Sequence, residues 1–103
     1  MTIRHLIMLK ICCEEKDMHT QHLHDIKAWI ESLQGVTPGM LSFAVTLNAR
    51  KDKDALDLVL DSRFTSWESL TAYLESKEHI AVVERVKPFK PKRAVVDYEE
   101  YPR

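Results

Sequence analysis

Apolar and polar positions alternate along the chain in patterns that predict four strands and two helices. Residues 3–12 are almost continuously apolar, which is typical of a strand buried on both faces in the middle of a sheet. His5 is a polar residue on its apolar face. The charged stretch 14–17 predicts the start of a helix that runs to about Gln34 and is stopped by Gly35. The apolar stripe of this helix has spacings of three and four residues and comprises Leu23, Ile26, Trp29, Ile30 and Leu33.

The centre of the chain predicts a β-hairpin. Pro38-Gly39 indicates a turn, and the strand after it alternates apolar with polar residues. Its expected core face comprises Leu41, Phe43, Val45 and Leu47. A polar connection over 48–54 leads to a third strand, in which Leu56, Leu58 and Leu60 alternate with Asp57, Val59 and Asp61.

The last third of the chain predicts a broken helix and a final strand. Ser66, with Ser69 three residues later and Glu68 between them, offers an N-terminal cap. The helix is expected to bury Trp67, Leu70, Tyr73 and Leu74, and then a second set, His79, Val82, Val83 and Val86. His79 lies about 120° around an ideal helix from Tyr73, which indicates a break near Ser76-Lys77. Pro88 and Pro91 end the helical region, and 94–98 is the final strand.

This order predicts a single α+β domain over residues 1–103, ferredoxin-like βαββαβ, with a four-stranded antiparallel sheet. Two helices cover one sheet face, so another apolar set would remain open: Leu6, Met8, Ala44 and Val59. Charged residues of both signs are expected beside it: Arg4, Lys10, Asp57 and Asp61. A second copy of the chain is the simplest cover, which predicts a homodimer through the open sheet face.

Composition narrows the classes of function. The net charge of −1 gives no basic excess for nucleic acid, and no apolar run reaches the roughly 18 residues needed to cross a bilayer. The N-terminus shows no signal-peptide pattern, so the sequence predicts a soluble cytoplasmic protein, with Cys12 and Cys13 as reduced thiols. Gly35 and Gly39 are the only glycines, and no phosphate loop or dinucleotide fingerprint is present. We therefore expect no cofactor.

His79, Tyr73 and His5 are the candidates for chemistry. An imidazole near its ordinary pKa can take and return a proton, and the Tyr73 hydroxyl can donate or orient. The alternative is that each histidine is buried and satisfied by a backbone carbonyl. His19, His22 and His24 lack the spacing of a recognised zinc site, so a solvated helix end is favoured and no metal is predicted. Trp29 and Trp67 are expected to pack in the core, although the same side chains can line an apolar pocket.

Four stretches resemble the stress-responsive dimeric α/β-barrel (Dabb) family. They are Ile3 to Lys10; Pro38-Gly39 with Leu56 to Leu60; Phe64 to Leu70 followed by Tyr73 and His79; and Val96-Asp97-Tyr98. The resemblance implies a ferredoxin-like protomer that pairs through its sheet, with a cleft between sheet and helices. A plant member, olivetolic acid cyclase, performs a cofactor-free aldol cyclisation. Its proposed histidine and tyrosine match His79 and Tyr73, and a pocket histidine matches His5. A further pocket histidine falls at Leu58, and a proline that commonly precedes the matched histidine falls at Lys77.

The resulting hypothesis is a dimeric Dabb protein with a small apolar pocket. His79 and Tyr73 would be catalytic, and His5, Ile7, Leu58 and Trp67 would contact a ligand. The chemistry would be cofactor-free acid/base catalysis, of cyclase or lyase type, on a small carbonyl or aromatic compound. One alternative is a non-enzymatic, stress-associated binding or assembly module. Another is a monooxygenase-like relative of the same barrel.

Overall fold

The computed structural model describes residues 1–12, 18–50 and 52–102 of the 103-residue chain. Its elements are β1 (Thr2–Lys10), α1 (His19–Glu31), β2 (Met40–Leu47), β3 (Leu58–Phe64), α2 (Trp67–Glu75), α3 (Lys77–Val86), a short 3-10 helix (Lys87–Phe89) and β4 (Lys92–Glu100). The strands form one sheet in the order β2-β3-β1-β4, and all neighbours are antiparallel. The predicted α+β ferredoxin-like fold, with β2 and β3 as a hairpin, is confirmed.

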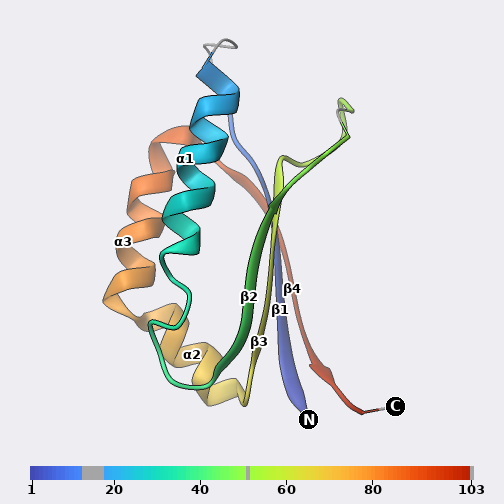
Figure 1. Ribbon diagram of the computed structural model, residues 1–103, viewed down its shortest axis with the longest axis vertical. Helices are drawn as coiled ribbons and strands as arrows, with labels where there is room; N and C mark the ends of the chain where they lie inside the picture. The colour runs from blue at the N-terminus through green and yellow to red at the C-terminus, as the bar shows by residue number, and fades with distance from the viewer. Residues whose placement is uncertain (13–17, 51, 103) are drawn as a thin grey trace.

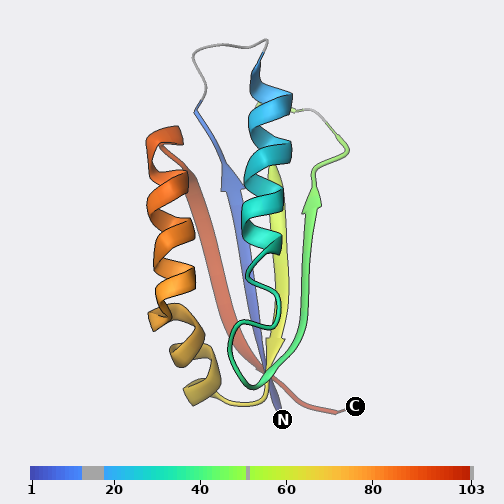
Figure 2. The same ribbon diagram turned by 60° about the vertical axis from the view of Figure 1, so that its left-hand side comes forward.

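The helices lie on one side of the sheet and leave its other side uncovered (Figure 1). Seen from the helical side, α1 crosses the middle of the sheet and α3 runs beside the edge strand β4 (Figure 2). The core between these layers is built by alternate residues of β1, β2 and β3, which point toward the helices because strand side chains alternate between the two faces. Its buried members are Ile3, Leu9, Ile11, Ile26, Ile30, Leu33, Phe43, Val45, Leu58, Leu60, Phe64, Leu70, Tyr73 and Val86.

Several predicted boundaries shift in the structure. The proposed helix start at 14–17 lies outside the described residues, and α1 ends at Glu31 rather than Gln34. β3 begins at Leu58 rather than Leu56. A bulge between Met40 and Ser42 interrupts the alternation of β2, so Leu41 is 55% exposed and does not belong to the core face. Cys12 is exposed and free, while Cys13 lies outside the described residues.

The predicted helix break is present at Ser76. This residue has an extended backbone conformation between α2 and α3, and its side chain accepts a hydrogen bond from the His79 N–H. At the start of α2, Ser66 and Ser69 form the reciprocal hydrogen bonds of a capping box, as the sequence predicts. Each helix therefore begins with its own serine cap, and the chain turns between Tyr73 and His79.

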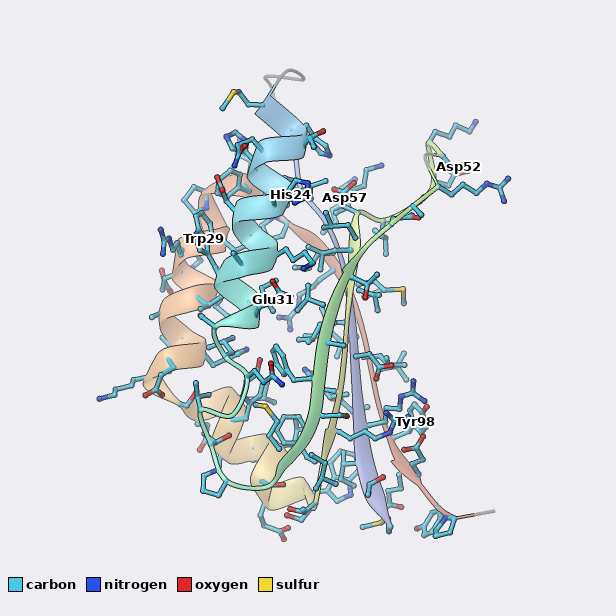
Figure 3. All side chains as sticks on the ribbon, viewed as in Figure 1. His24, Trp29, Glu31, Asp52, Asp57 and Tyr98 are labelled. Carbon is cyan, nitrogen blue, oxygen red and sulfur yellow. The ribbon has the colours of Figure 1, made fainter. Side chains whose placement is uncertain are left out.

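The open sheet face carries apolar side chains between paired charges. Leu6, Met8, Ala44 and Val59 lie on this face, as predicted, and Val96 and Tyr98 extend it onto β4. The side chain of Tyr98 points away from the helices (Figure 3).

Arg4 of that face pairs with acidic residues of the same chain. The Arg4 guanidinium donates to both carboxylate oxygens of Asp61, at 2.7 and 3.0 Å, and contacts Glu100 at 3.3 Å. The sequence suggested that Asp57 lies on this face, but in the structure it does not. It precedes β3, and its carboxylate accepts from the Ile11 N–H and lies 3.5 Å from His19 (Figure 3). Among the described residues, no helix is both long and apolar enough to span a membrane.

Candidate functional site

A small cavity lies between the sheet and the helices, with α1, α2 and α3 contributing to its walls. Its volume is about 100 Å³. The lining residues are Ile7 and Leu9 of β1, Ile30 and Leu33 at the end of α1, Leu60 of β3, Tyr73 of α2, His79, Val82, Val83 and Val86 of α3, and Pro91 and Arg93 at the start of β4. Most of this wall is hydrocarbon, so water inside the cavity finds few partners and an apolar group is favoured there.

His79 is the half-buried imidazole of this cavity, in the first turn of α3. The backbone carbonyl of Leu74 lies 3.0 Å from its Nδ1. A carbonyl oxygen only accepts, so Nδ1 carries the hydrogen and Nε2 of the neutral ring keeps its lone pair. No hydrogen bond joins Nε2 to another described residue. Burial lowers the pKa of His79 and outweighs the opposing effect of the Leu74 carbonyl, and the electrostatic influence of His5 and of Arg93 lowers it further.

Tyr73 stands beside His79, with the two ring centroids 4.9 Å apart. It is 1% exposed, and its ring also contacts Phe43, Phe64 and His5. Burial raises the pKa of the Tyr73 phenol well above its ordinary value, so its hydroxyl keeps its proton. Within the described parts of the chain, no acceptor is bonded to this hydroxyl. Tyr73 is therefore a hydrogen-bond donor beside the base.

His5 lies behind Tyr73 rather than on the cavity wall. It is 2% exposed, and its ring centroid is 6.3 Å from that of Tyr73. Its Nδ1 is paired with the carboxylate of Asp97 on the neighbouring strand β4. Its Nε2 is buried without a partner among the described residues, an arrangement that costs stability unless another group reaches it. His5 thus supports the ring of Tyr73 but does not line the cavity.

Of the remaining residues predicted to contact a ligand, one lines the cavity and two do not. Ile7 lines the cavity. Leu58 is 2% exposed in the core and is not among the lining residues. The helical spacing suggested that Trp67 faces inward, but it does not. Trp67 is the first residue of α2 and is 41% exposed, and its indole N–H donates to Glu99 at 3.2 Å.

Two features of the cavity did not follow from the sequence: the place of Arg93 on its wall, and the hydrogen bonds that Ser76 makes at the predicted break. Arg93 brings a cation to the cavity, and its place follows from the pairing of β4 with β1 opposite Leu9, which the sequence does not reveal. Ser76 holds the break: its hydroxyl donates to the Tyr73 carbonyl at 2.7 Å and accepts from the His79 N–H at 3.2 Å. The signal for Ser76 was available, because serine is a preferred helix cap.

The three histidines of α1 do not gather at one point. His19 lies 3.5 Å from Asp57, His22 stacks edge-on against Phe89 with ring centroids 5.0 Å apart, and His24 is exposed (Figure 3). In the described ranges, no three His, Cys, Asp or Glu side chains are grouped as metal ligands.

Comparison with known proteins identifies the family. The model of the stress-responsive A/B barrel domain (Dabb) matches residues 3–100. Among solved structures, a dimeric ferredoxin-like protein of unknown function from Bacteroides fragilis superposes with a TM-score of 0.82 at 23% identity, covering 96% of each chain. A hydroxynitrile lyase from Passiflora edulis has a TM-score of 0.75 at 17% identity, covering 98% of this chain and 97% of its own.

A Dabb family protein from Mesorhizobium loti gives a TM-score of 0.66 at 18% identity, with 98% of both chains covered. No curated protein matches the sequence. At these identities the solved structures show the fold, and the family follows from the match that spans almost the whole chain. The chain belongs to the stress-responsive A/B barrel (Dabb) domain family.

Proposed function

We propose that this chain is a cofactor-free acid/base enzyme of lyase or cyclase type that acts on a small carbonyl or aromatic compound. The observation that carries the proposal is the state of His79. Its Nδ1–H is fixed on the Leu74 carbonyl, its pKa is lowered, and its Nε2 lone pair has no acceptor role elsewhere in the described chain. A neutral imidazole with a free lone pair is the form that a general base requires.

In the proposed reaction, Nε2 of His79 takes a proton from an acidic C–H or hydroxyl of the bound compound. When the proton comes from a C–H, the electron pair of that bond moves onto the neighbouring carbonyl oxygen as an enolate, and Tyr73 donates a hydrogen bond to this oxygen. The imidazolium then returns a proton to the same carbon. When the proton comes from a hydroxyl, the O–H pair forms a new carbonyl, the bond from that carbon to the leaving group breaks, and the leaving group departs with the electron pair as an anion (cyanide in the case of a cyanohydrin). The imidazolium then protonates this anion, which restores the starting state of His79 in both cases. The apolar walls strengthen these interactions by excluding water.

The relatives give this proposal partial support. One protein with the same fold is a hydroxynitrile lyase, so the fold is compatible with a lyase. A competing proposal, a binding or assembly module, is favoured by one observation. Tyr73 is 1% exposed within a cluster of rings that includes Phe43 and Phe64, which is also what a purely structural tyrosine shows.

A proton-exchange assay separates the two proposals. The methyl protons of acetophenone test abstraction from carbon, by loss of their NMR signal in deuterium oxide. Racemic mandelonitrile tests abstraction from a hydroxyl, by the absorbance of released benzaldehyde. We expect one of these rates to exceed that of buffer, and His79→Gln to lower it by about 100-fold or more, as for loss of a general base.

The control is His24→Gln, because His24 is exposed on α1 and does not line the cavity. This variant should retain the full rate. A second variant, Val83→Trp, adds a large side chain to the cavity wall while keeping the His79 imidazole in the chain, and should also abolish the reaction. The proposal is refuted if the wild-type protein is no faster than buffer on both probes, or if Val83→Trp and a folded His79→Gln keep the rate.

We also propose that the protein is a homodimer paired through the open sheet face. Two relatives with this fold are described as dimeric. The open face carries large apolar side chains, with Val96 51% exposed and Met8 37% exposed. Arg4 and Asp61 of this face are already paired with one another, so covering the face leaves both with partners.

A further inference from the structure

Arg93 is the one fully charged side chain on the wall of the cavity that holds His79. We propose that Arg93 is the anion-binding residue of this cavity, and that the ligand it takes is a small apolar monocarboxylate. The inference rests on the proposed function for its location beside His79, and it adds the class of ligand.

Among the described residues, Arg93 has no competing anion. No hydrogen bond or ion pair joins its guanidinium to another residue in the described chain. Its cross-strand neighbour on β1 is Leu9, which is apolar. The next carboxylate on the same face of β4 is Asp97, four residues or about 13 Å along the strand, and it is already paired with His5. The guanidinium therefore stands free at an apolar opening.

The charge of the cavity favours a monoanion of planar shape. Guanidinium binds a carboxylate through two parallel N–H···O bonds, a geometry that lysine does not offer. His79 is neutral in this environment, so the site carries a single positive charge. A phosphate dianion would place a second negative charge against the valine side chains of α3 without a cation to meet it, which costs desolvation energy.

The size of the cavity limits the apolar part of the ligand. An engineered apolar cavity of about 150 Å³ holds benzene. A cavity of about 100 Å³ with an open mouth accommodates a phenyl ring or a branched chain of similar size, in part, with the carboxylate outside at Arg93. Val83 of α3 and Arg93 of β4 line the cavity and are both exposed, so we place the mouth of the cavity between them. The helix α3 runs beside β4 on the helical side of the sheet (Figure 2). A partner chain on the open sheet face leaves this mouth clear.

The ligand would also alter His79. The positive charge of Arg93 is one of the causes that lower the pKa of His79. A bound carboxylate offsets that charge, so the pKa of His79 should rise on binding. A neutral molecule of the same shape should leave it lower. Binding therefore has a readout at the imidazole that does not depend on catalysis.

The test uses phenylacetate and its neutral isostere phenylacetamide as probes. Affinity is measured by titration calorimetry, and the His79 ring signals are followed by NMR against pH. We expect phenylacetate to bind wild-type protein at least about tenfold more tightly than phenylacetamide, which corresponds to one partly exposed charge-assisted contact. Arg93→Gln should remove this preference, and Arg93→Lys should restore part of it.

The matched control is Arg50→Gln, which removes the same charge from the exposed connection between β2 and β3. It should leave both affinities unchanged. Equal binding of the two probes by wild-type protein, no binding of either at millimolar concentration, or full affinity in Arg93→Gln would each overturn the inference. Its failure is distinct from that of the proposed function: acetophenone exchange without a carboxylate preference refutes only the role of Arg93, and a carboxylate preference without turnover of any probe refutes only the enzyme.

Discussion

The protonation state of His79 follows from where its two nitrogens lie. Burial against an apolar cavity disfavours the charged ring, and this outweighs the Leu74 carbonyl, which holds the Nδ1–H and by itself favours the charged form. The same burial keeps Tyr73 protonated. A base without its proton and an acid with its proton thus lie side by side at neutral pH, with ring centroids 4.9 Å apart.

We expect the folded-state pKa of His79 to lie below 6.5 in an NMR titration of its ring carbon-bound protons. In the unfolded chain the pKa is higher, so below about pH 6.5 the unfolded state binds more protons. The contribution of His79 to the free energy of unfolding is therefore complete above that pH. It is lost as the pH falls through the folded-state pKa.

Urea denaturation of His79→Gln provides the comparison. Between pH 6.5 and 5, its stability should decline less than that of the wild-type protein. Asp61 and Glu100, whose pKa values are lowered by their arginine partners, lose their contributions at more acidic pH and affect both proteins alike. A His79 that titrates at or above 6.5 would contradict the cause assigned here.

At this scale, the sequence predicted that Tyr73 and His79 lie together, but it did not predict their surroundings. Spacing and family resemblance placed Tyr73 and His79 together, and both line the cavity. Trp67 was assigned inward because it shares the apolar spacing of Leu70 and Tyr73, yet the first turn of α2 projects past the sheet edge and its indole reaches Glu99. Arg93 lies in a polar stretch that gives no periodic signal, so only strand register brings it to the site.

Among the connections between elements, the one from α1 to β2 depends on a single residue, Gly39. Gly39 has φ of +88°, in the left-handed region, and its carbonyl accepts from the Thr65 N–H at 2.9 Å. A Cβ added at Gly39 would lie 2.6 Å from the Ser69 Cβ and 2.8 Å from the Thr65 hydroxyl. The loop is thereby pressed against the start of α2, which carries Tyr73.

We expect Gly39→Ala to lower the free energy of unfolding by about 3 kcal/mol, from left-handed strain together with the steric clash. Gly35→Ala is the matched control, because Gly35 has φ of +76° but no atom within 4 Å of the added carbon. It should cost only the strain, about 1 kcal/mol. Equal losses for the two variants in urea denaturation would show that the contact with α2 contributes nothing.

The order of elements could be predicted because apolar alternation and helical spacing differ in period. The break at Ser76 could be predicted as well, from the angular mismatch between Tyr73 and His79. The bulge near Leu41 could not, because in the sequence Leu41 continues the apolar alternation of Phe43, Val45 and Leu47 without a break. Strand ends also shifted, since Asp57 satisfies the Ile11 N–H at the end of β1 instead of continuing β3.

For the whole molecule, the decisive measurement is the strength of dimerisation through the open sheet face. We expect a dimer at micromolar concentration, and Val96→Asp should weaken it by about 100-fold, because it places an unpaired carboxylate in a covered apolar surface. Ile80→Asp is the control: Ile80 lies on α3 and, like Val96, is 51% exposed in the single chain. Sedimentation equilibrium should show wild-type assembly for Ile80→Asp. A monomeric wild-type protein, or equal effects of the two variants, would refute pairing through the sheet.

The serine-capped break between α2 and α3 separates two groups of residues that line the cavity. Tyr73 and His79, the groups proposed to move protons, lie just before and just after the break, whereas Val82, Val83 and Val86, which line the cavity, follow on later turns of α3. The side chains of these valines are apolar and form no hydrogen bond with Tyr73 or His79. Different turns of the chain therefore supply the apolar wall that limits ligand size and the groups proposed to transfer protons. We expect that substitutions can change one of these properties separately from the other.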